Sequence, residues 1–384
     1  MSLLRQPMSV WATAFAAVIA FMGIGLVDPI LPSIAQGLQA TPSQVSLLFT
    51  SYFLVTAVAM LVTGWVSSRI GGKRTLLLGL TLVIVFAALA GTSGSVAELV
   101  GFRAGWGLGN ALFVATALAV IVGAATGGAE SAIILYEAAL GLGISAGPLV
   151  GALLGDWNWR APFFGTATLM AVGFVLIATM LRSTPVPEVK TRLSAPLRAL
   201  AHGGLSTTAF TALFYNFAFF TVLAFTPFIL GMDAYGIGAV FFGWGVCVAL
   251  ASVFGAPPLQ RRLGSVNVLH LALAVLAVCQ VGIALSGHAG IIVFTIASGV
   301  PIGLCNTVFT ESAMEVSDAP RPVASAGYNF VRWMGGALAP FVATKLGEEV
   351  GVAVPYVLGA TCCLVGMAIL YGRRQHLGAL AVVG

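Results

Sequence analysis

Charged side chains are scarce in this chain. Only 8% of its 384 residues are Asp, Glu, Lys or Arg, whereas 59% are hydrophobic; a soluble domain usually carries about 25% charged residues. So few charges cannot cover a globular surface in water, which excludes soluble folds and indicates an integral membrane protein. The net charge of +5 is then expected to orient loops, and it gives no argument for a nucleic-acid partner.

Cysteine and the patterns of covalent or metal chemistry are equally sparse. The five cysteines lie in apolar segments, without CxxC or His-paired spacing, which predicts packing residues rather than disulfides or a metal site. The sequence also lacks a nucleophile–base pair and a phosphate-binding loop. We therefore expect no enzyme activity, no metal and no cofactor.

What the chain has in place of charge is long apolar runs. A membrane-spanning helix needs about 20 such residues, and the runs do not alternate as β-barrel strands do. The first run resembles a signal peptide, but it is long enough to span and has no convincing cleavage site, so we expect a retained helix. Twelve spans are expected, at 9–35, 43–66, 75–93, 96–123, 131–154, 161–181, 206–230, 237–258, 266–286, 289–311, 323–345 and 353–371.

The basic residues orient these spans. If the N-terminus is cytoplasmic, 13 of the 17 Lys and Arg residues fall at the cytoplasmic side, the bias expected of inner loops. An even number of spans then places both termini in the cytoplasm. The exceptions are Arg103, Arg160, Arg332 and Lys345.

The longest polar stretch divides the chain into halves. We expect a six-helix bundle at 1–181, a cytoplasmic linker at 182–205 and a second bundle at 206–384, with a short amphipathic helix on the membrane surface around 193–202. The halves look like copies of each other, which is typical of secondary transporters. The matches are Tyr136 with Tyr328, Gly143 with Gly335, Pro148 with Pro340, Asn110 with Asn306, Phe21 with Phe219, Pro29 with Pro227, and RIG at 69–71 with RLG at 262–264.

Several motifs carry a family resemblance. GWVSSRIGGKR at 64–74, RAGWGLGNA at 103–111, GISAGPLVGA at 143–152 and the following WNWRAPFF resemble the signatures of the major facilitator superfamily, and within it the twelve-helix drug/proton antiporters. The resemblance covers essentially the whole chain. It implies two pseudo-symmetric six-helix bundles around a central cavity, a monomer in a bacterial inner (cytoplasmic) membrane, and export of amphiphilic or lipophilic compounds driven by the proton gradient.

The loop at 64–74 is expected to be a gate. The resemblance implies that Arg69 holds the two halves together on the cytoplasmic side, although Lys and Arg residues there also determine topology. Ser68 stands where the family has Asp, which removes one charge partner. The expected gating residues are Gly64, Arg69, Gly71, Lys73 and Arg74.

Glycines and a proline weaken the segment at 143–151. Gly143, Gly147 and Gly151 are spaced to lie on one helix face that permits close approach, and Pro148 cannot donate its backbone hydrogen bond. This pattern fits either static tight packing or a helix that bends and rocks during alternating access; the resemblance favours the second.

Two embedded carboxyl groups and one embedded arginine are candidates for proton coupling. Charges within a membrane are costly and usually functional, and removal from water favours the neutral form of a carboxyl group. We expect Asp28 and Glu137 to carry the proton, in competition with substrate. The resemblance implies that Arg103 controls the protonation of a nearby acid. Interhelical hydrogen bonds are the structural alternative for each.

Rings and amides in the membrane segments are candidates for a small-molecule cavity, which is usually apolar with a few polar points. Arg332 also needs a partner, and Glu311 and Glu315 are expected to supply one. The candidate cavity residues are Asn110, Tyr215, Asn216, Phe219, Trp244, Asn306, Tyr328, Asn329 and Arg332. The alternatives are an exporter of one metabolite (a siderophore, sugar or lipid), a proton symporter, and a membrane receptor or scaffold that transports nothing.

Overall fold

The computed structural model describes residues 6–124, 128–182 and 190–377; the side chains of 122–123, 128–134 and 137–138 also lie outside that description. Within these ranges the chain is helical. Glu137, one of the two predicted proton carriers, therefore lies outside the described side chains. Eleven helices of the described part are long and apolar enough to cross a membrane.

Six spans make up the first half, and the first of them is interrupted. Its helix α1 stops before a 3-10 turn, η1, because Pro29 follows Asp28, and α2 completes the span. The elements are α1 (Met8–Gly25), η1 (Asp28–Ile30), α2 (Leu31–Gly37), α3 (Pro42–Ile70), α4 (Gly72–Thr92), α5 (Val96–Ala124), α6 (Gly128–Trp157) and α7 (Ala161–Met180).

The second half repeats this order after a short linker helix. Its second span is also interrupted, by a π-helical turn, η2, which one residue, Ala256, separates from Pro257 and Pro258. The elements are α8 (Ala195–Ala199), α9 (Gly203–Ile229), α10 (Ala234–Leu250), η2 (Ala251–Gly255), α11 (Ala256–Leu263), α12 (Ser265–Leu285), α13 (His288–Glu315), α14 (Arg321–Glu349), α15 (Val354–Gly372) and η3 (Arg374–Leu377).

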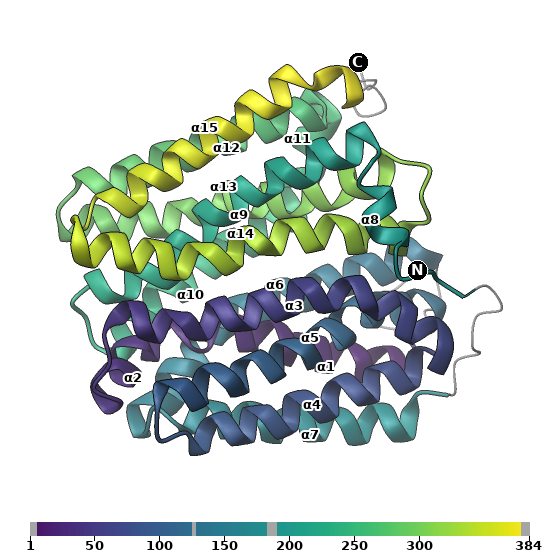
Figure 1. Cartoon of the computed structure of the whole chain (residues 1–384), viewed down its shortest axis with the longest axis horizontal. Helices are drawn as coiled ribbons and strands as arrows, with labels where there is room; N and C mark the ends of the chain where they lie inside the picture. The colour runs from purple at the N-terminus through teal and green to yellow at the C-terminus, as the bar shows by residue number, and fades with distance from the viewer. Residues whose placement is uncertain (1–5, 125–127, 183–189, 378–384) are drawn as a thin grey trace.

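The halves form two layers of helices, with α1 to α7 below and α9 to α15 above in Figure 1. We call the end that carries α8 and α11 the linker end, and the end that carries α2 and the start of α10 the far end. Across the layers α3 packs against α14, and α6 packs against α10. The all-α fold with twelve long helices is as expected, although α14 does not reach the hydropathy of a spanning helix. This helix packs between α3 and α9, and of its charged residues Arg332 is buried whereas those near the helix ends are exposed.

The two matched loop sequences adopt the same backbone conformation. Gly71 has φ 84° and Gly264 has φ 78°, and each ends one helix and begins the next. L-residues with a Cβ rarely adopt such positive φ values. A glycine is therefore required at the same point of both halves, which supports the sequence repeat.

Candidate functional site

A cavity of about 380 Å³ lies between the two halves. Its wall comes from α1, α3, α5 and α6 on one side and from α9, α10, α13 and α14 on the other. The cavity is lined by Phe21 and Trp244, and it also reaches Ser68, Thr191 and Pro322 at the linker end. A volume of a few hundred Å³ is typical of sites for small organic molecules.

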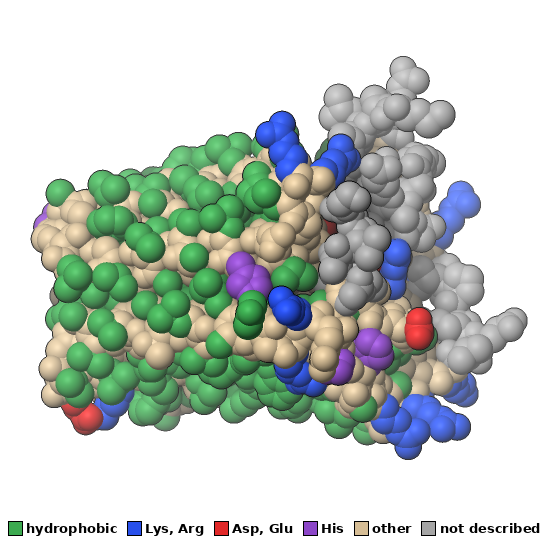
Figure 2. Space-filling model, turned by 90° about the horizontal axis from the view of Figure 1, so that it is seen from above, with side chains coloured by type: hydrophobic (Ala, Val, Ile, Leu, Met, Phe, Trp, Pro, Cys, Tyr) green, Lys and Arg blue, Asp and Glu red, His purple; other side chains and the backbone are tan. Residues whose placement is uncertain are grey.

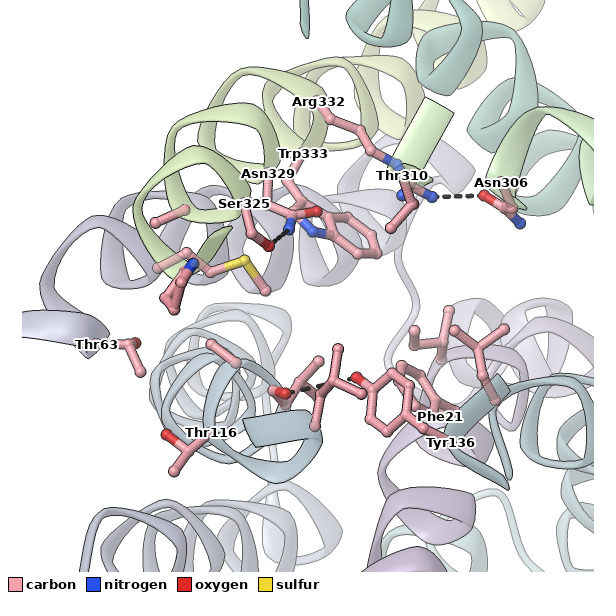
Figure 3. Close-up of a pocket in the computed structure, with 18 of the residues that line it drawn as sticks. Phe21, Thr63, Thr116, Tyr136, Asn306, Thr310, Ser325, Asn329, Arg332 and Trp333 are labelled. Carbon is pink, nitrogen blue, oxygen red and sulfur yellow. Dashed lines mark hydrogen bonds between the residues drawn. The ribbon is translucent and has the colours of Figure 1, made fainter. Parts of the chain in front are cut away.

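Aromatic rings supply much of the apolar wall. In Figure 3, Phe21 and Tyr136 face the cavity from the first half, while Trp333 faces it from the second. Phe21 and Tyr136 contact each other edge to face, with ring centroids 5.6 Å apart. Phe219 and Phe220 complete the set, together with Trp244. These rings can bury a lipophilic or aromatic compound without requiring one shape.

Among the described residues that line the cavity, Arg332 carries the charged side chain. Its Nη2 donates to Asn306 Oδ1 at 2.5 Å and its Nη1 to Tyr328 Oη at 3.5 Å. Tyr215 Oη also donates to Asn306 Oδ1, at 2.8 Å, and the Nδ2 of Asn216 donates to the Arg332 carbonyl oxygen at 3.0 Å. These groups hold the guanidinium in one orientation at the cavity wall.

This arrangement corrects one expectation. Arg332 does not pair with Glu311 or Glu315, because no such ion pair exists among the described side chains. Glu311 instead accepts a hydrogen bond from Gln260 at 2.9 Å. Glu311 and Glu315 lie late in α13, toward the linker end, whereas Asn306, which accepts from Arg332, lies more than one turn before them on that helix.

The predicted cavity residues fall into three groups. Phe219, Trp244, Asn306, Asn329 and Arg332 line the cavity. Tyr215, Asn216 and Tyr328 are buried behind the wall and hydrogen-bond the residues that line it. Asn110 is buried in α5 and is not part of the lining.

Sequence reasoning missed several lining residues. They include Tyr136, Leu140 and Ile144 on α6, which recur every fourth residue and therefore share one helix face. The glycine pattern of α6 drew attention to its close packing with a neighbouring helix and not to the side chains that line the cavity. The match of Tyr136 with Tyr328 was the available signal. Other polar or aromatic lining residues that were missed include Phe21, Thr63, Ser67, Thr116, Thr191, Phe220, Thr310, Ser325 and Trp333.

Asp28 and Arg103 lie together in the core of the first half, outside the cavity lining. Both side chains are completely buried and interact electrostatically with each other. The Arg103 guanidinium also lies over the rings of Tyr52 and Trp106, each 4.4 Å from the centroid. Within the described residues neither the carboxyl nor the guanidinium group has a hydrogen-bond partner, an expensive arrangement in a protein interior.

The turn that carries Asp28 touches the other half. Element η1 packs against α6 of its own half and against α9 and α10 of the second. Asp28 therefore lies next to the surface along which the two halves meet.

The far end of the cavity is closed by contacts between the halves. Phe53 of α3 stacks on Trp333 at 5.1 Å and contacts Phe220 at 4.3 Å. Nearer the far end, the Ser43 amide donates to Glu348 Oε1 at 2.7 Å, so this carboxylate caps α3 from the opposite half. A second hydrogen bond between the halves runs from Tyr235 Oη of α10 to Asp156 Oδ2 of α6, at 3.1 Å. The structure is thus sealed at the far end.

Helix α6 is packed closely on two sides. A Cβ at Gly143 would lie 2.5 Å from the Val18 carbonyl oxygen, and one at Gly147 would lie 2.7 Å from that of Met22. Gly151 repeats this contact at Leu26. The glycine face therefore packs on α1 within its own half, while Pro148 and Ala152 approach Gly238 of α10 across the interface.

The glycine-arginine loop contacts the linker. Arg69 Nη1 donates to the carbonyl oxygens of Trp65, at 3.0 Å, and Thr191, at 3.4 Å. Ser68 Oγ accepts a hydrogen bond from the Thr191 amide at 3.2 Å. Lys73 Nζ donates to two carbonyl oxygens at the end of α7. The described hydrogen bonds of this loop thus go to its own half and to the linker.

Known proteins resemble the whole chain. The sequence profile of the Major Facilitator Superfamily matches residues 13–340. The multidrug efflux protein YfmO of Bacillus subtilis (strain 168) is 51% identical over 381 residues, which cover 98% of this chain and 96% of that protein. Multidrug resistance protein 1 of the same organism is 22% identical, over 94% and 95% of the two chains.

A solved structure shares the fold. The human organic anion transporter MFSD10 (TETRAN) superposes with a TM-score of 0.73 at 17% identity, over 94% of this chain and 99% of that one. At this identity the likeness concerns the fold alone. The chain belongs to the Major Facilitator Superfamily, and it is a membrane transporter rather than an enzyme.

Proposed function

We propose that this transporter exports amphiphilic or lipophilic small molecules from the cytoplasm in exchange for protons. The observation that carries the proposal is the aromatic cavity between the halves, which extends to Ser68, Thr191 and Pro322 at the linker end and is closed by contacts between the halves at the far end. The excess of basic residues at the linker end supports a cytoplasmic location for that end. The multidrug efflux protein YfmO, at 51% identity, supports the substrate class.

In the proposed cycle a compound enters the cavity from the cytoplasmic side and contacts the rings and Arg332. The halves then rock, which separates α3 from α14 and α6 from α10 at the far end and closes the linker end. The compound leaves outward. Gly64, Arg69, Gly71, Lys73 and Arg74 form the gate that closes the cytoplasmic side in this outward-facing state, and Pro148 provides the bend in α6.

We assign proton coupling to Asp28 and Arg103. We keep Glu137, which the sequence analysis predicted, as a second proton carrier. Because Asp28 lies outside the cavity lining, we propose that proton and compound do not compete for it. Coupling instead acts through η1, which packs against α9 and α10. An ionised Asp28 favours a far end opened to water, since burying an ion is costly, and a neutral Asp28 favours the sealed arrangement.

Transport in proteoliposomes tests the proposal. The protein acts as a monomer in a bacterial inner membrane, with protons as the driving force and no cofactor. Vesicles with an imposed pH gradient are expected to show proton movement that depends on added compound, in a panel of cationic, neutral and anionic lipophilic dyes. Protein-free vesicles give the background. If no dye moves protons above that background, proton-coupled efflux is the wrong function.

A further inference from the structure

The linker segment 190–200 connects the two halves at the linker end. Near its start, Thr191 is bonded through its amide to Ser68 Oγ and through its carbonyl oxygen to Arg69, both on α3. The serine hydroxyl therefore attaches the linker to the first half.

The other end of this segment is attached to the second half. Helix α8 packs against α14, with Pro196 buried. A Cβ at Gly327 would lie 2.7 Å from the Pro196 carbonyl oxygen and 3.3 Å from Leu200. The same helix continues to Asn329 and Arg332 in the cavity wall. The linker segment thus ties α3 to α14 where the cavity approaches the cytoplasmic side.

The outward side of the linker segment combines apolar and basic side chains. Leu193, in the turn before α8, is 52% exposed, and Leu197, within α8, is 50% exposed. Arg192 and Arg198 flank them and are exposed, and residues 190–200 include no acidic side chain. Exposed leucines are poorly placed in water, whereas leucines beside arginines are typical of helices that lie at a membrane surface.

Charge at this end of the molecule fits an anionic membrane surface. Figure 2 shows Lys and Arg side chains gathered at the linker end, with few Asp or Glu side chains among them on the visible face. Basic side chains near a membrane are each attracted to anionic headgroups by about 1 kcal/mol. Charge and exposed apolar surface therefore point to the same partner, a phospholipid with a net negative headgroup.

We propose that the linker segment 190–200 is a binding site for an anionic phospholipid. Arg192 and Arg198 contact its phosphate, and Leu193 and Leu197 insert beside its acyl chains. The bound lipid holds the segment against the membrane and so stabilises the arrangement in which it ties α3 to α14. Anionic lipid then favours the inward-facing state, whatever compound the cavity carries.

Native mass spectrometry of the full-length protein tests the binding directly, without a transport assay. The probes are phosphatidylglycerol and phosphatidylcholine with identical acyl chains. The double variant R192Q/R198Q is expected to lose roughly 10- to 30-fold in affinity for phosphatidylglycerol. The matched control is R261Q/R262Q, which removes two exposed arginines from α11 at the same end, and it is expected to stay within about threefold of the wild type.

Two outcomes overturn the lipid site. One is equal affinity of the wild-type protein for both lipids, and the other is an equal loss in both arginine variants, which would mean general surface attraction. The variant L193S/L197S keeps the charge and is also expected to bind phosphatidylglycerol more weakly than the wild type. Unchanged binding in that variant would likewise contradict insertion of the leucines.

A second measurement tests the tie between the halves. Phosphatidylglycerol is expected to raise the thermal unfolding temperature of the wild-type protein more than phosphatidylcholine does. In Ser68→Ala the acceptor of the Thr191 amide is lost, so the lipid still binds but this extra stabilisation is reduced. If Ser68→Ala is stabilised as much as the wild type, the linker does not transmit lipid binding to α3.

Discussion

Asp28→Asn is expected to abolish proton-driven export while leaving compound binding intact. Asn has nearly the shape of a protonated Asp but cannot release a proton. Asp28 does not line the cavity, so the wall that contacts the compound is unchanged. An exchange of one proton for one neutral compound can sustain about a tenfold concentration ratio per pH unit, since one unit is worth 1.36 kcal/mol. The Asp28→Asn variant is expected to sustain no concentration ratio of the compound in response to the pH gradient.

Two assays on the same purified protein separate these effects. Equilibrium binding of a transported dye is expected to match the wild type, whereas dye accumulation in acid-loaded vesicles falls to the level of protein-free vesicles. Glu98→Gln is the matched control, because Glu98 is an exposed carboxylate of the same half, in the first turn of α5, that accepts a hydrogen bond from the Gly94 amide. Loss of dye binding in Asp28→Asn would place this residue in the compound site and contradict a separate proton site.

The second large effect is expected from adding a single methyl group to α6. The Cβ of Gly151→Ala would overlap the Leu26 carbonyl oxygen of α1, and a backbone carbonyl in a packed helix cannot move aside cheaply. Overpacking costs about 1–3 kcal/mol when flexible side chains absorb it. Here the helices themselves must separate, so we expect a loss at or above that range, seen as a lower unfolding temperature and reduced yield from membranes.

Gly101→Ala is the control for this change. Gly101 lies within α5, and a Cβ there would meet no atom within 4 Å. Alanine is the better helix former by about 0.5–1 kcal/mol, so this variant is expected to be at least as stable as the wild type. Equal stability of the two variants would show that α1 and α6 do not need the glycine face.

The fold was predictable because its signals extend over many residues. Long apolar runs predicted the helices, and repeated short matches predicted the two similar halves. Phe21 and Phe219 both line the cavity. Gly143 and Gly335, also matched in the sequence, each face a backbone carbonyl of the first helix of their half, at Val18 and Leu213. The repeat therefore carried real information about packing.

Side-chain partners were harder to predict because they depend on which helix faces are opposed. Arg332 was expected to pair with Glu311 or Glu315, but among the described residues its side chain donates to Asn306 and Tyr328. Trp333 was overlooked although it stacks on Phe53 of the other half. The partner of Phe53 is set by how two bundles meet, 280 residues apart in the sequence, and no periodicity within one helix reports that contact.

Distances between spin labels test the central claim, that ionisation of Asp28 opens the far end. In protein whose five cysteines are replaced, one label pair at Gln44 and Val350 spans the far end and another at Leu78 and Leu263 spans the linker end. Raising the pH is expected to lengthen the first distance and shorten the second. In Asp28→Asn both distances are expected to keep their low-pH values. An identical pH response in the variant, or distances that do not move in opposite directions, would contradict the account.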